Sequence, residues 1–128
     1  MLITKPSHLS VAETIDEIKT KLNAKGINIF SEIDHAQAAR ESNLELRDEV
    51  LLIFGNPNVG TYLMQEKPSI GIDLPLKILV WQDLNGKTQI TYIDPIKLGE
   101  RHGIQENLQI LQNMSLLMAN LATVTDIR

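Results

Sequence analysis

Residues 76–94, LKILVWQDLNGKTQITYID, hold two apolar runs that flank Asn85-Gly86. Asn-Gly between two such runs is the preferred two-residue turn of a β-hairpin. A turn of this length sets the register so that Trp81 lies opposite Ile90 and shares one face of the sheet with Tyr92. Both faces of the hairpin are apolar enough to need a cover. Helices on one face would therefore leave the other to a second copy of the chain or to a ligand.

The segments around the hairpin supply further strands and helices. Ser10 and Glu13 have the spacing of a capping box and Gly26 suits a helix C-terminus, which predicts a helix between them. Period-two alternation predicts a strand over 27–34, with Ile29 and Ile33 on one side, and the opening LITK adds another. A broad apolar stripe over 104–121 predicts a long closing helix.

A second strand-turn-helix unit precedes the hairpin. Residues 49–54, EVLLIF, form a continuous apolar run that is typical of a central strand buried on both faces. Asn56 is placed to cap a helix and Pro57 to begin it, so we expect a helix that runs to about Glu66. Asp94-Pro95 repeats this pattern before a short helix.

Composition indicates one domain over residues 1–128. The formal net charge is −4 with no basic block, so nucleic acid is not an expected partner. The absence of cysteine excludes disulfides and thiolate chemistry. The N-terminal residues lack a signal-peptide pattern and no stretch approaches the length of a membrane span, so we expect a cytoplasmic protein without membrane partners.

Four motifs together resemble those of domain-of-unknown-function family 302, a family of small bacterial and archaeal proteins, over nearly the whole chain. They are IDHAQAA (33–39), FGNPNVGTYLMQ (54–65), IDLPLKILVWQDLNGKTQITYIDP (72–95) and RHGI (101–104). The resemblance implies an α+β fold of the TATA-binding-protein-like class: a two-layer α/β sandwich, β-α-β4-α, whose antiparallel sheet carries helices on one face. It also implies a homodimer and brings no established activity. Fold likeness to that class does not imply DNA binding.

The Gly55–Thr61 turn is the first candidate site. A helix N-terminus offers backbone N–H groups and partial positive charge to a carboxylate or phosphate, here from residues 58–60 with Gly60 among them, and Thr61 adds a hydroxyl. The alternative is that Asn56 itself caps these groups. The turn is neither a Walker loop nor a dinucleotide fingerprint, and we expect no cofactor.

His35 is the second candidate, because it begins a short helix that Asp34 and Gln37 are spaced to cap. Its imidazole suits a general acid, a general base or a metal ligand. One histidine with no second ligand at short spacing does not predict a metal site. His8 and His102 lie near the ends of elements, where we expect exposed surface histidines.

Further polar and aromatic candidates surround the hairpin. Lys77 and Asp94 are expected to pair at its open end, with Asp73 just before it, and such an exposed pair mainly fixes the strand end. Tyr92 and Trp81 could line a small-molecule pocket. The alternative is that they are core residues or anchors of a dimer interface.

These patterns favour a homodimeric domain that binds a small polar or anionic ligand near the Gly-Asn-Pro turn. The candidate ligand-binding residues are His35, Asn56, Gly60, Thr61, Asp73 and Tyr92. A second hypothesis is a small enzyme that uses His35 with Asp73 or Asp34, which requires these side chains to meet in one cleft. A third is a structural module for dimerisation or docking.

Overall fold

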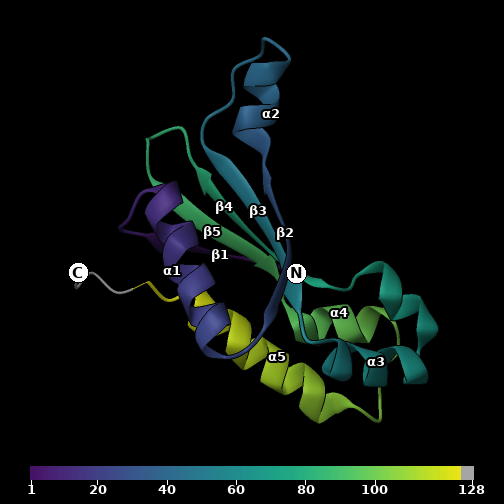
Figure 1. The fold of residues 1–128 in the computed structure, drawn as a ribbon. Coiled ribbons are helices and arrows are strands. Elements are labelled where there is room, and N and C mark those ends of the chain that lie inside the picture. The colour runs from purple at the N-terminus through teal and green to yellow at the C-terminus, as the bar shows by residue number, and fades with distance from the viewer. Residues whose placement is uncertain (125–128) are drawn as a thin grey trace.

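The computed structural model describes residues 1–124, which form an antiparallel sheet with helices packed on one face (Figure 1). In sheet order the strands are β1 (Leu2–Ser7), β5 (Thr88–Ile93), β4 (Leu76–Gln82), β3 (Glu49–Gly55) and β2 (Asn28–Asp34). The helices are α1 (Val11–Ala24), α2 (His35–Glu41), α3 (Pro57–Glu66), the 3-10 helix η1 (Pro68–Ile72), α4 (Pro95–Arg101) and α5 (Leu108–Leu121). The predicted α+β class is confirmed.

Figure 1 shows how the helices divide among the parts of the sheet. The two long helices, α1 and α5, lie on the same side of it, and α1 packs against β2, β3 and β4. The short helix α2 projects beyond one end of the strands, whereas α3 and α4 gather at the other end. The short helices thus extend the two ends of the predicted two-layer arrangement.

Local capping sets the starts of α1, α3 and α4 as the sequence predicts. The closing helix α5 begins at Leu108 rather than at the predicted Ile104, and the side chain of its N-cap, Asn107, does not cap it. The Ser10 hydroxyl accepts the N–H of Glu13 at 3.1 Å, and the Glu13 carboxylate accepts the N–H of Ser10 at 3.1 Å. Gly26 follows the helix with a φ of +68°, a left-handed conformation that favours glycine. Asn56 and Asp94 each accept an N–H two residues ahead and so start α3 and α4.

A β-bulge in β2 corrects the expected pattern of that strand. Ile29 pairs with Phe54 and Ser31 pairs with Ile53, the residue just before Phe54 in β3, so Phe30 is an extra residue in the ladder. The shift places Ile29 and Ile33 on opposite faces of the sheet rather than on the predicted common face. Phe30 is left half exposed at the end of the sheet where α3 begins.

The face of β3 that points away from the helices is not fully covered, which corrects the prediction of a strand buried on both faces. Val50, Leu52 and Phe54 are buried beneath the helices. The alternate residues Leu51 and Ile53 remain partly exposed. The unbroken apolar run therefore reflects two different environments: a closed core and an open sheet face.

The β4–β5 hairpin has a register one residue away from the predicted one. Trp81 lies opposite Gln89 and not Ile90. Gly86 has a φ of +77°, and Asp83 accepts the N–H groups of Asn85 at 2.9 Å and Lys87 at 3.0 Å. The Asp83 side chain thus organises a three-residue loop over 84–86, which displaces the expected two-residue turn.

The register change separates residues that were predicted to share a face. Tyr92 is buried beneath the helices, whereas Trp81 lies on the opposite face and donates its Nε1–H to the Thr91 hydroxyl at 2.9 Å. The predicted ion pair is also wrong. Lys77 donates to the Pro75 carbonyl, and Asp94 caps α4.

The sheet face opposite the helices carries a band of apolar side chains, which we call the open face. At its margins Leu2 is 66% exposed and Ile33 37% exposed. Between them lie the partly exposed side chains of Leu51, Ile53, Leu79, Trp81 and Ile93. Within residues 1–124, no helix packs over this face (Figure 1).

Candidate functional site

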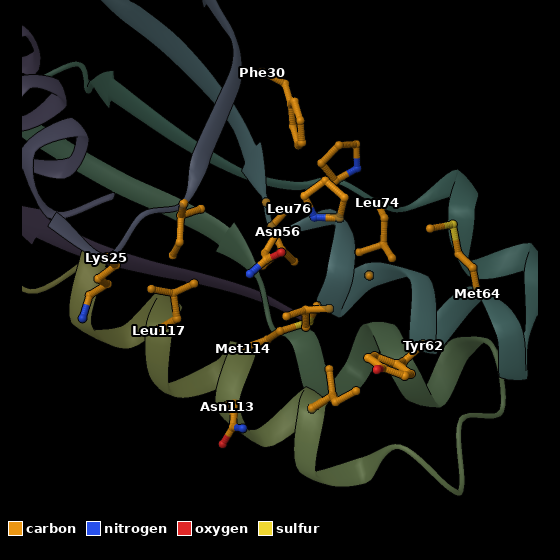
Figure 2. A pocket seen from close by; sticks show the side chains of 17 residues that line it. Lys25, Phe30, Asn56, Tyr62, Met64, Leu74, Leu76, Asn113, Met114 and Leu117 are labelled. Atoms are coloured by element: carbon orange, nitrogen blue, oxygen red, sulfur yellow. The ribbon is translucent and has the colours of Figure 1, made fainter. Parts of the chain in front are cut away.

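A cavity of about 650 Å³ lies where the ends of β2 and β3 meet α3 and α5 (Figure 2). One part of its wall is the segment that links α1 to β2, together with Phe30 of β2. The Gly55–Gly60 turn, residues 74–76, α3 and α5 form the rest. The lining side chains are predominantly apolar and include Phe30, Val59, Leu74, Met114 and Leu117. This volume falls within the range of about 300–1,000 Å³ that is typical of small-molecule sites.

The Gly-Asn-Pro turn borders this cavity, but its backbone amides are already used. Asn56 Oδ1 accepts the N–H of Asn58 at 3.0 Å, and the Asn56 carbonyl accepts those of Val59 and Gly60 at 2.9 and 3.1 Å. The Thr61 hydroxyl donates to the Pro57 carbonyl at 2.6 Å. The self-capping interpretation therefore describes this turn, and an anion cradle of these amides does not.

A few polar groups stand among the apolar side chains of the cavity. In Figure 2, Lys25 lies at one end of the row of lining residues and Met64 at the other, with the Asn56 amide between them. Because Asn56 uses its oxygen as a cap, its Nδ2 is the group that this side chain can offer to a ligand as a donor. Among the lining residues in the described chain, Lys25 alone carries a formal charge.

The six predicted ligand-binding residues do not converge on one site. Asn56 and Gly60 line the cavity. Thr61 lies beside Gly60 near the start of α3, and its hydroxyl donates a hydrogen bond to the Pro57 carbonyl. Asp73 and Tyr92 border a second cavity of about 280 Å³ at the adjoining end of β4 and β5.

His35 lies far from the other predicted residues. It begins α2, beyond the end of the sheet opposite α3 and α4 (Figure 1). Its neighbour Asp34 pairs with Val50, whereas Leu76, near Asp73, pairs with Phe54 at the other end of β3. The cleft that would join His35 to Asp73 is therefore not formed. The carboxylate of Asp34 is occupied as the cap of α2, where it accepts the N–H of Gln37 at 2.9 Å.

A hydrogen-bonded cluster forms around His102, which was predicted to be an ordinary exposed histidine. Only 9% of its side chain is exposed, and its Nε2 lies 2.5 Å from Asp73 Oδ2. Its Nδ1 lies 2.8 Å from the Ser69 hydroxyl, and Arg101 contacts the same carboxylate at 3.3 and 3.4 Å. The hydrogen bond from His102, with the charge of Arg101, holds the pKa of Asp73 below its usual range.

A carboxylate that the sequence patterns did not identify as functional holds two walls of the larger cavity together. Glu66, at the end of α3, accepts the backbone N–H groups of Gln105, Glu106 and Asn107 at 2.7, 3.0 and 3.1 Å. These hydrogen bonds lower the pKa of Glu66 to about 2. Because residues 105–107 lead into α5, these hydrogen bonds, which we call the Glu66 clamp, hold α3 against the start of α5.

Comparison with known proteins places this architecture in a family. The model of the family described as "Domain of unknown function DUF302" matches residues 3–121. The chain belongs to this family. A solved DUF302 protein, the uncharacterized conserved protein from Bacillus stearothermophilus, superimposes with a TM-score of 0.84 at 22% identity over 94% of each chain. At that identity the likeness concerns the fold of the DUF302 domain.

Curated relatives with higher identity are longer proteins. "Fluoride-specific ion channel FluC 1" of Brucella suis is 46% identical over 103 residues, which are 80% of this chain and 41% of the relative. The protein of the same name from Brucella abortus has the same identity, with 38% of its length matched. The chain thus spans about two fifths of these relatives. None of the helices within residues 1–124 has the length and apolarity needed to cross a membrane.

Proposed function

We propose that this DUF302 domain binds a small, largely apolar organic anion in the cavity between the Gly-Asn-Pro turn and α5. The observation that carries the proposal is the cavity itself, of about 650 Å³, which lies at the most distinctive motif of the chain. Its apolar walls would remove the hydrocarbon part of a ligand from water, a gain of about 25 cal/mol per Å² of buried apolar surface.

The polar groups of the cavity suggest how such a ligand would be oriented. Lys25, exposed at one end, would face a carboxylate, and the free Nδ2 of Asn56 would donate one hydrogen bond midway. Tyr62 and Met64 at the opposite end would contact the apolar tail. Because the amides of the α3 N-terminus are occupied, this arrangement favours an organic carboxylate over inorganic phosphate.

Calorimetric titration with octanoate, octanol and inorganic phosphate tests the proposal. Octanoate should bind, octanol more weakly, and phosphate without measurable heat. Leu117→Trp places a large ring in the cavity and should abolish binding, whereas Leu116→Trp, at a neighbouring position 70% exposed, should not. Equal octanoate affinity in the two folded variants, or no binding by the wild type, would refute the proposal.

We also propose that the open face forms a homodimer interface. An apolar sheet face without a helical cover is typical of a protein interface. Leu79→Glu, near the centre of this face, should convert a dimer to a monomer in light scattering. Leu84→Glu, on the exposed hairpin loop, should leave the dimer intact. A monomeric wild type would contradict this second proposal without bearing on the first.

For the longer Brucella relatives, we propose that the matched region contributes ligand binding rather than fluoride conduction. The motivation is that the cavity in this domain has predominantly apolar walls. Fluoride should accordingly leave the thermal unfolding midpoint of this chain unchanged under conditions where octanoate raises it. A stabilisation by fluoride that Leu117→Trp removes would argue the opposite.

A further inference from the structure

We propose that Ser69 is a nucleophile activated by His102 and that it hydrolyses carboxylic esters with a short acyl group. The two residues belong to different elements, η1 and the end of α4, and their side chains meet at 2.8 Å. Asp73 lies on the other side of the imidazole at 2.5 Å. This cluster is separate from the residues that line the larger cavity.

The hydrogen-bond partners determine the direction of each bond in the neutral imidazole. An ionised carboxylate only accepts, so the nitrogen that faces Asp73, Nε2, carries the proton. Nδ1 is then an acceptor, and the Ser69 hydroxyl donates to it. Arg101, at 3.3 Å from Asp73, supports the ionised state of that carboxylate. Ser69 thus directs its proton at a base that a partly buried carboxylate orients. The two ring nitrogens exchange the places they have in the serine-protease triad, but the chain of serine, imidazole and carboxylate that activates a serine nucleophile is the same.

The surroundings of Ser69 suit a small acyl donor. Ser69 is exposed, whereas His102 is largely buried behind it, so a substrate can reach the hydroxyl without displacing the base. Lys67, two residues earlier, extends beside the turn that follows His102: its Cε lies 3.8 Å from the position of a Cβ on Gly103. Its ammonium group can stabilise the negative charge that develops on an attacked carbonyl oxygen.

The reaction proceeds through an acyl-enzyme. Ser69 Oγ attacks the ester carbonyl carbon while His102 Nδ1 takes the hydroxyl proton. The tetrahedral intermediate then expels the alcohol oxygen, which receives that proton from His102. In the second half, water attacks the acylated Ser69 and loses a proton to His102, which returns it to the Ser69 oxygen as the carboxylic acid leaves. The sum is ester plus water to acid plus alcohol.

Incubation of the full chain with p-nitrophenyl acetate, followed by peptide mass spectrometry, tests the proposal. One acetyl group should appear on Ser69, and its formation should slow at least about 100-fold in His102→Ala. Ser69→Ala should lose the modification, and Ser42→Ala, at another exposed serine, should retain it. Acetylation of Ser69 no faster than that of Ser42, or undiminished in His102→Ala, would overturn the proposal.

Chemical rescue distinguishes two reasons why His102→Ala could lose acetylation: an altered structure, or the missing general base. Added imidazole should restore acetylation of Ser69 in His102→Ala and should have no such effect in Ser69→Ala. Asp73 acts through His102, so Asp73→Asn should lower the maximal acetylation rate without changing the half-saturating ester concentration. Failure of imidazole to restore any acetylation in a folded His102→Ala protein would count against a base role for His102.

Discussion

Glu66 accepts both the backbone N–H and the side-chain Nδ2–H of Asn107, at 3.1 and 2.8 Å, and so joins the end of α3 to the start of α5. Two more N–H groups, from Gln105 and Glu106, point to the same carboxylate. Both helices line the larger cavity. The shape of the proposed ligand site therefore depends on one surface carboxylate 39 to 41 residues away in sequence from its partners.

Glu66→Gln should destabilise the fold, with an effect that depends on pH. The pKa of Glu66 is lowered from 4.5 to about 2 in the folded chain. Its contribution is therefore fully present above pH 4.5 and is lost as the pH falls toward about 2. Urea unfolding across this range should show a difference between wild type and variant that shrinks with acidification. Glu106→Gln, which leaves the clamp intact, is the matched control, and a constant difference would contradict this account.

Gly99→Ala should destabilise the packing of α4 on α5. A Cβ at Gly99 would lie 2.1 Å from Leu111 Cδ1, and Leu111 is only 2% exposed, so it has little room to move. Overpacking of this kind costs about 1–3 kcal/mol, against a gain in helix propensity of up to about 1 kcal/mol. Chemical denaturation measures the change. In a Leu111→Ala background the same substitution should cost less, since the overlap is removed.

Gly86→Ala should weaken the hairpin, because residue 86 has a φ of +77° in the three-residue loop. A left-handed conformation costs a residue with a Cβ about 1–2 kcal/mol. Gly86→Asn should retain more stability than Gly86→Ala, since asparagine tolerates this region better. Equal unfolding free energies for all three proteins would indicate that the loop does not hold this conformation in solution.

Lys25→Gln should reduce the affinity for octanoate while sparing octanol, because Lys25 supplies the charge at the cavity rim. The residue is exposed, so the loss should be modest, up to about fivefold or ~1 kcal/mol. Lys87→Gln, on the hairpin away from the cavity, controls for the change in net charge. A similar loss for octanoate and octanol would show that the ligand charge does not face Lys25.

Local sequence chemistry predicted the starts of α1 and α3 because each depends on residues within one turn of the chain. It placed the start of α5 four residues too early, since no side chain caps that helix. Ser10 with Glu13, and Asn56 with Pro57, fulfil their predicted capping roles. The family motifs, together with these elements, also predicted the α+β class. The same short range explains the success of the self-capping interpretation at Asn56, whose hydrogen-bond partner is only two residues away.

Strand register was harder to predict, because a single residue changes it. The Asn85-Gly86 pair suggested a two-residue turn, but Asp83 binds two backbone amides of the loop and favours a longer one. The extra residue at Phe30 similarly reversed the expected alternation in β2. Each shift moves side chains to the opposite face, which is why Trp81 and Tyr92 were wrongly placed together.

Local sequence patterns could not predict the side-chain clusters, because their members meet only in the folded chain. His102 is 33 residues from Ser69 and 29 from Asp73, and its position near a helix end suggested an exposed side chain. The cavity was anticipated only at its Gly-Asn-Pro margin. Its other walls come from the apolar side chains of α5, whose stripe is equally typical of core packing.

The most direct test of the ligand-binding proposal is a two-dimensional amide NMR titration of the full chain with octanoate. Shifts should concentrate at the residues lining the larger cavity, among them Val59, Gly60, Met114 and Leu117, and should disappear in Leu117→Trp. Shifts confined to the open face around Leu79 and Trp81, or none at saturating octanoate, would contradict it.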